Sequence, residues 1–87
     1  ARHVVTVHGR TISLTRSEFQ LLRLLAARPG EVFARAQIME ELWQTEFDGD
    51  ERACDVHISN LRQKIETDAQ RPELIQTVRG IGYKFAE

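Results

Sequence analysis

The stretch from about Arg52 to Thr67 constrains the fold more than any other, because its apolar residues recur at helical spacing. At about 100° per residue, one stripe of this helix is apolar and is expected to face a core: Cys54, Ile58, Leu61 and Ile65. The opposite face is rich in hydrogen-bonding groups and has few carboxylates: Arg52, Val56, Ser59, Asn60 and Gln63, flanked by His57, Arg62 and Lys64. The chain is therefore expected to pack around this helix and to leave its polar face exposed.

Two β-hairpins are predicted, one at each end of the chain. Residues 3–7 are β-branched and residues 11–14 alternate polar and apolar, with Gly9 in the turn between them. Near the C-terminus, residues 74–78 and 83–86 are strand-like, and the short connection between them contains two glycines. Two glycines in so short a connection indicate a tight turn.

Two further helices are predicted between the hairpins. The first begins at a capping box formed by Thr15 and Glu18. Its apolar positions recur at helical spacing: Phe19, Leu22, Leu25 and Ala26. Pro29-Gly30 ends this helix, a short extended piece follows at residues 31–33, and another helix runs from about Arg35 to Trp43. The order is that of an α+β fold, three helices between two hairpins, in one domain over residues 1–87.

Composition narrows the class of protein. The single cysteine excludes a disulfide within the chain and fits a reducing, cytoplasmic compartment. No apolar run is long enough to cross a bilayer, and no signal peptide opens the sequence, so no membrane association is expected.

Charge is distributed unevenly along the chain. Residues 1–30 hold five arginines and one glutamate, whereas residues 31–51 hold one arginine and seven acidic residues. Residues 52–87 hold six basic and five acidic residues, so the net charge of −1 hides an acidic stretch between two basic ones. Such asymmetry suggests separate surfaces for separate partners. A solvated acidic loop on a neutral protein would produce the same pattern.

Metal, cofactor and enzymatic sites are not expected. Cys54 and His57 have helical spacing, but Cys54 lies on the core stripe and no second cysteine exists. Asp48, Asp50 and Glu51 lack the spacing of a calcium loop. The two glycines near the C-terminus are too close together for a nucleotide-binding fingerprint, and no nucleophile with its base is recognisable.

Several motifs together resemble one known family. They are Leu14-Thr15-Arg16-Ser17-Glu18-Phe19-Gln20-Leu21-Leu22, Val32-Phe33-Ala34-Arg35, Leu42-Trp43, Asp55-Val56-His57-Ile58-Ser59-Asn60-Leu61-Arg62 and Thr77-Val78-Arg79-Gly80-Ile81-Gly82-Tyr83. In this order they resemble the C-terminal winged-helix output domains of OmpR/PhoB-family response regulators. The last two motifs are the most specific.

The resemblance implies a function and partners. The helix from Arg52 would be a recognition helix in the DNA major groove, and the C-terminal hairpin a wing whose Arg79 meets the minor groove or its phosphates. The loop with Glu46, Asp48 and Asp50 would contact RNA polymerase. A phosphorylatable receiver domain, and one or more N-terminal strands, would precede this chain in a two-component regulator that binds DNA as a dimer.

The residues of the recognition helix have chemistry suited to DNA. Asn60 can pair bidentately with adenine, Arg62 with guanine or phosphate, and Val56 can pack on a thymine methyl group. Asp55 could accept from cytosine or orient a neighbouring arginine, and His57 could contact phosphate or remain solvated. The helix contributes further candidates: Arg52, Ser59, Gln63 and Lys64.

Four candidates lie outside that helix. Arg79 is either a charge at the tip of the hairpin or, since glycines flank it closely, an arginine for a narrow minor groove. Thr77 could be an ordinary strand residue or a phosphate donor. Trp43 and Tyr83 could each be core residues or contact DNA through their polar atoms.

One departure from the family affects the expected DNA affinity, and one rival function stays open. Many relatives carry arginine or lysine where this chain has Ser59 and Asn60, which predicts weak intrinsic DNA affinity. The rival is a winged helix that binds protein through its acidic loop. The salt dependence of DNA binding would separate the two, because DNA binding weakens steeply with salt.

Overall fold

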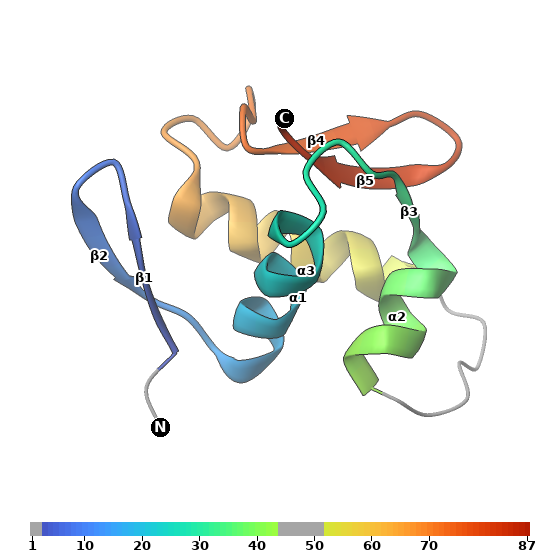
Figure 1. The fold of residues 1–87 in the computed structure, drawn as a ribbon, viewed down its shortest axis with the longest axis horizontal. Helices are drawn as coiled ribbons and strands as arrows, with labels where there is room; N and C mark the ends of the chain where they lie inside the picture. Colours follow the sequence, from blue (N-terminus) through green and yellow to red (C-terminus); the bar gives the residue numbers. More distant parts are fainter. Residues whose placement is uncertain (1–2, 44–51) are drawn as a thin grey trace.

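The computed structural model describes residues 3–43 and 52–87, apart from the Trp43 side chain. Within these ranges, three helices lie between two antiparallel hairpins, as predicted (Figure 1). The elements in chain order are β1 (Val4–Val7), β2 (Arg10–Ser13), α1 (Arg16–Ala26), β3 (Phe33–Ala34), α2 (Arg35–Trp43), α3 (Arg52–Ile65), β4 (Ile75–Val78) and β5 (Gly82–Phe85). The β1–β2 hairpin lies at one end of the molecule, far from the β4–β5 turn (Figure 1).

The β1–β2 hairpin is shaped by its two-residue turn. His8 and Gly9 have φ values of 50° and 78°, the positive pair that matches the twist of a hairpin. The hairpin is attached to α1 through His3, whose ring lies 5.0 Å from that of Phe19 and whose carbonyl accepts from Leu14 N–H. The predicted N-terminal hairpin is confirmed.

Helix α1 begins at the predicted capping box. The Thr15 hydroxyl accepts from the Glu18 N–H at 3.2 Å, and Glu18 Oε1 accepts from the Thr15 N–H at 2.9 Å. Its buried apolar positions are Leu21 and Leu25, while Phe19, Leu22 and Ala26 are only half-buried. The predicted apolar face was therefore displaced: it omitted Leu21, which has no exposed surface.

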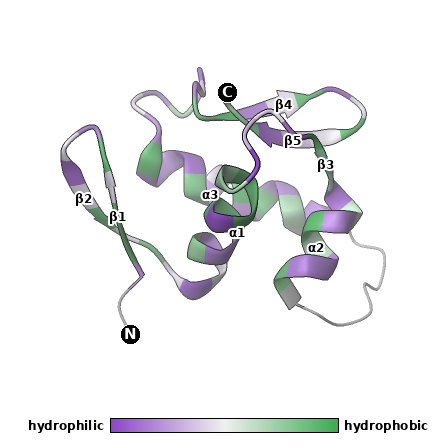
Figure 2. Cartoon of the chain, in the orientation of Figure 1, coloured by the Kyte–Doolittle hydropathy of each residue, from purple (hydrophilic) through white to green (hydrophobic). Residues whose placement is uncertain are grey.

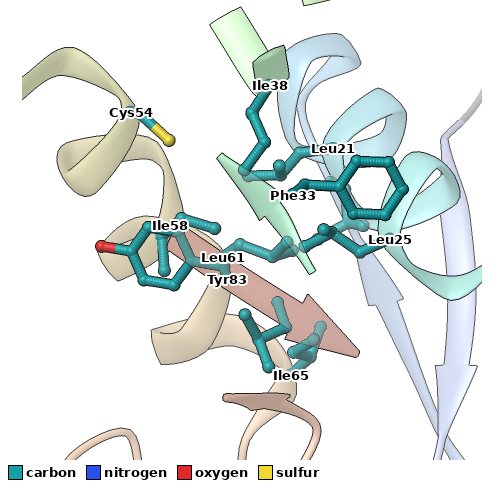
Figure 3. Close-up of a cluster of buried hydrophobic side chains, with 11 residues drawn as sticks. Leu21, Leu25, Phe33, Ile38, Cys54, Ile58, Leu61, Ile65 and Tyr83 are labelled. Atoms are coloured by element: carbon teal, nitrogen blue, oxygen red, sulfur yellow. The ribbon is translucent and has the colours of Figure 1, made fainter. Parts of the chain in front are cut away.

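The core forms where α1, α2, α3 and the C-terminal sheet meet. The predicted α3 stripe is confirmed, since Cys54, Ile58, Leu61 and Ile65 are at most 1% exposed and pack with α1 and with Phe33 and Ile38 (Figure 3). The residues predicted to face outward are exposed: Arg52, Ser59, Asn60 and Gln63.

The C-terminal hairpin is part of a three-stranded sheet with the order β3-β5-β4. Phe33 pairs with Tyr83 and Ala34 with Gly82, so the predicted extended piece is a strand, displaced from 31–33 to 33–34. A Cβ at Gly82 would lie 2.0 Å from the Phe33 carbonyl oxygen. Gly82 is thus required by the β3–β5 pairing, whereas Gly80 has a φ of 75°, a backbone conformation of the turn that favours glycine.

Helix α3 ends two residues earlier than predicted, and the residue after it is a buried carboxylate. Glu66 is 6% exposed, and its two oxygens accept from the backbone N–H groups of Glu73, Leu74 and Ile75 at 2.8 to 3.1 Å. These bonds attach the beginning of β4 to the end of α3.

Candidate nucleic-acid interface

The outer face of α3 carries five exposed side chains without a carboxylate among them: Arg52, Val56, Ser59, Asn60 and Gln63. Val56 is 57% exposed and is the apolar member of this face. His57 is half-buried at the edge of this face. Figure 2 shows the resulting alternation of hydrophilic and hydrophobic segments along α3.

Asp55 lies beside this face but is already hydrogen-bonded within the protein. Its Oδ1 accepts from the Tyr83 hydroxyl at 2.6 Å, and its Oδ2 accepts from Arg35 Nη1 at 3.0 Å. The ion pair with Arg35 is partly solvated, because the Asp55 side chain is 41% exposed. Its negative charge is therefore compensated locally, which lowers the repulsion that a polyanion would meet at this end of α3.

Tyr83 is a core residue with a polar end. It is 8% exposed, and Figure 3 shows its ring beside α3 with the hydroxyl oxygen toward that helix. Burial, together with the hydrogen bond to the Asp55 carboxylate, raises the pKa of Tyr83 to about 12. The hydroxyl thus stays protonated and donates to Asp55 throughout the neutral range.

Arg62 spans from α3 to the wing. Its Nε and Nη2 donate to the Ile75 carbonyl at 3.1 and 2.8 Å, and Nη2 also donates to the Thr77 hydroxyl at 2.8 Å. Its guanidinium carbon lies 5.4 Å from the centre of the Tyr83 ring, within the range of a cation–π contact. Arg62 and Thr77 are therefore bound to each other before any DNA is present.

Lys64 is likewise held within the protein. Its ammonium lies 2.6 Å from Oε1 of Glu18, the capping-box residue of α1. Burial alone would raise the pKa of Glu18, but the bonds from Lys64 and the Thr15 backbone outweigh it, so the pKa lies below its usual value. The lysine thereby links α3 to α1.

The turn between β4 and β5 presents the most exposed part of the wing. Arg79, Gly80 and Ile81 are all exposed, and the Ile81 side chain is 57% exposed. Between the wing and the starts of α2 and α3 lies a hollow of about 210 Å³, with one lining residue from each helix and the rest from the wing: Arg35, Asp55, Thr77, Val78, Arg79, Gly80, Ile81, Gly82 and Tyr83. The structure thus brings Arg79 and Asp55, at the N-terminal part of α3, to the walls of one hollow.

Two residues at this surface received no role from the sequence. Arg35 belongs to a quoted family motif, but only the structure shows that it meets Asp55, twenty residues away. The exposure of the Ile81 side chain was predictable from its place between two glycines in a short turn, which offers no neighbouring side chains to bury it.

Some predicted residues lie outside the described part of the chain. The Trp43 side chain and the residues Glu46, Asp48 and Asp50 fall there. Within residues 3–43 and 52–87, no cluster of three or more histidine, cysteine or acidic side chains could hold a metal ion. No helix in the same ranges has the length and apolar character needed to cross a membrane.

Known proteins resemble this chain over most of its length. The family model "Transcriptional regulatory protein, C terminal" matches residues 9–85. The sensory transduction protein RegX3 of Mycobacterium tuberculosis H37Rv is 46% identical over 84 residues, 97% of this chain and 37% of RegX3. The chain thus spans little more than a third of the length of such relatives.

Solved structures share the fold. The response regulator DrrB of Thermotoga maritima, an OmpR/PhoB homologue, is 35% identical with a TM-score of 0.81, over 91% of this chain and 36% of DrrB. The DNA-binding domain of Klebsiella pneumoniae RstA, solved in complex with the RstA box, is 36% identical with a TM-score of 0.85, over 95% of this chain and 82% of that domain. The predicted winged-helix fold is confirmed, and the chain belongs to the family of C-terminal domains of OmpR/PhoB-type transcriptional regulatory proteins.

Proposed function

We propose that this domain binds promoter DNA sequence-specifically, as the output domain of a two-component transcriptional regulator. The observation that carries the proposal is the exposed, carboxylate-free outer face of α3, together with the exposed Arg79 of the wing turn, which lines one hollow with Asp55 of α3. An α-helix fits the major groove, and an arginine at a narrow turn fits the minor groove. The likeness to the RstA domain in its DNA complex supports this arrangement.

The exposed side chains of α3 supply the proposed contacts with DNA bases. We assign adenine to Asn60 and a thymine methyl group to Val56, since both are exposed on α3. Arg52, His57, Ser59 and Gln63 lie on or beside the same face and are proposed contacts. Arg62 and Lys64 use their charged groups within the protein, so any contact of theirs with DNA would be shared with those partners.

Regulation and assembly are proposed from the family. A receiver domain would control this domain in the cytoplasm, two copies would bind repeated half-sites, and no chemical reaction would be catalysed. RNA polymerase would contact the segment with Glu46 and Asp48, because acidic residues are repelled by DNA phosphates and suit a separate surface. Replacing both by their amides should reduce activated transcription while leaving operator affinity unchanged. A loss of DNA binding in that variant would contradict this division of surfaces.

The central test is selection from a random pool of duplex DNA, followed by titration of the selected sequence at several salt concentrations. A DNA-binding domain should select one sequence, with an affinity that falls linearly with salt on logarithmic axes. Asn60→Ala should abolish preference at one position of the site. The control is Gln70→Ala, an exposed amide in the loop after α3. Selection of no sequence would refute the proposal and favour the rival protein-binding function.

A further inference from the structure

We propose that Asp55, Tyr83 and Arg62 form a clamp that fixes the wing relative to α3, so that major-groove and minor-groove reading are energetically coupled. Asp55 and Tyr83 are then positioning residues that do not themselves read bases. This inference rests on the proposed function. Of the two roles that the sequence left open for Asp55, it selects the orientation of neighbouring side chains rather than contact with cytosine. It also extends the positioning role from α3 to Tyr83 on β5.

The first half of the clamp is at the N-terminal part of α3. The Asp55 carboxylate receives one hydrogen bond from β5, through the Tyr83 hydroxyl, and one from α2, through Arg35. Three elements that are distant in sequence therefore meet at one side chain. Because both oxygens are engaged, rotating Asp55 toward a base edge would break a bond to a largely buried tyrosine.

The second half lies about two helical turns further along α3, at Arg62. Its guanidinium bonds to two residues of β4, Ile75 and Thr77, and lies over the ring of Tyr83. Thr77 and Tyr83 are direct partners across the β4–β5 ladder. Arg62 therefore contacts both strands of the wing, and the two halves of the clamp meet at Tyr83.

The position of Arg79 depends on this clamp. Arg79 follows Thr77 by two residues at the end of β4, and both line the hollow that separates the wing from α3. A displacement of Thr77 or Tyr83 relative to α3 would carry Arg79 with it, because the turn beyond them is short and closed by a bond from Ile81 N–H to the Val78 carbonyl. The distance between the minor-groove arginine and Asn60 on α3 is thereby set by the clamp.

The test uses Tyr83→Phe, which keeps the ring in the core and removes only the hydroxyl. Affinity is measured on two selected DNA duplexes that differ only in the base steps beneath the wing, so that their ratio reports the Arg79 contact. Tyr83→Phe should move this ratio toward one. In the Arg79→Ala background, where the Arg79 contact is already absent, Tyr83→Phe should not change this ratio further. Thr6→Val, which removes an exposed hydroxyl from the distant β1–β2 hairpin, is the control and should leave the ratio unchanged.

Two outcomes would overturn the proposal. Equal loss of affinity on both duplexes, additive with Arg79→Ala, would mean that the hydroxyl only stabilises the fold. A change of base preference within the major-groove site for Asp55→Asn, without one for Tyr83→Phe, would mean that Asp55 reads a base.

A measurement without DNA separates this inference from the proposed function. Tyr83→Phe should accelerate hydrogen exchange of the Ile81 amide in the wing turn relative to amides of the β1–β2 ladder. Unchanged exchange would refute the clamp even if the domain binds DNA. Accelerated exchange in a domain that selects no DNA sequence would support the clamp and refute the proposed function alone.

Discussion

Replacing Glu66 by glutamine should destabilise the domain far more than its conservative chemistry suggests. Oε1 accepts from the N–H groups of Glu73 and Leu74, and Oε2 accepts from those of Leu74 and Ile75. A glutamine has only one acceptor oxygen, and its NH₂ group would face an N–H donor in either orientation. The backbone N–H of Glu73, which is partly buried, or that of Ile75, which is buried, would then lose its acceptor.

The size of the effect follows from these bonds. An orphaned buried N–H costs about 1–3 kcal/mol, and the remaining bonds lose the assistance of a charged acceptor, so a total of about 2–4 kcal/mol is expected. That is a large part of the roughly 5–15 kcal/mol by which a small domain is stable. The assay is urea unfolding followed by far-UV circular dichroism.

The matched control is Glu73→Gln, since the exposed Glu73 contributes only its backbone N–H to this site. Surface changes of this kind typically alter the free energy of unfolding by less than about 0.5 kcal/mol. If Glu66→Gln lowers the free energy of unfolding no more than Glu73→Gln does, the reasoning about the buried carboxylate is refuted.

Three further predictions concern DNA and pH. Arg79→Ala should weaken the selected site by about 1–3 kcal/mol and flatten its preference for A·T-rich flanks; titration on duplexes that differ only in their flanks checks this, and equal losses on both would show that Arg79 makes only a phosphate contact. Ser59→Arg should steepen the logarithmic salt slope by roughly one unit, and an unchanged slope would place this face away from the DNA backbone. Because the pKa of Tyr83 is raised to about 12, the free energy of unfolding should be unaffected by this group below the ordinary tyrosine pKa and should fall as pH rises toward 12; the loss should be absent in Tyr83→Phe, and an equal loss there would assign it to other groups.

The parts of the fold that the sequence predicted are those governed by local rules. The α3 stripe follows from helical periodicity, and the β1–β2 turn from the backbone preference of glycine. In α1 the same rule fails by one position, because Leu21 and Leu22 are adjacent and equally apolar. Periodicity cannot choose between them, and the choice is made by packing against the other helices.

In the candidate site, the sequence predicted correctly whether a short side chain on the helix is exposed, because the backbone position alone decides this. The exposure of Ser59 and Asn60 follows from their angle on the helix. Arg62 and Lys64 have long side chains, which reach partners that a helical projection does not show, on β4 and α1 respectively. The Asp55–Tyr83 bond joins residues 28 positions apart, and no local pattern contains that information.

The two glycines of the wing turn set a limit on how this domain can be re-engineered. A side chain at Gly80 would enter open space, and asparagine, which tolerates positive φ, is a feasible replacement. A methyl group at Gly82 would collide with backbone that belongs to another strand and cannot move aside as a side chain would. A library that varies Arg79 to Ile81 to alter DNA preference should therefore keep glycine at position 82, since any other residue there would disrupt the pairing of β3 with β5.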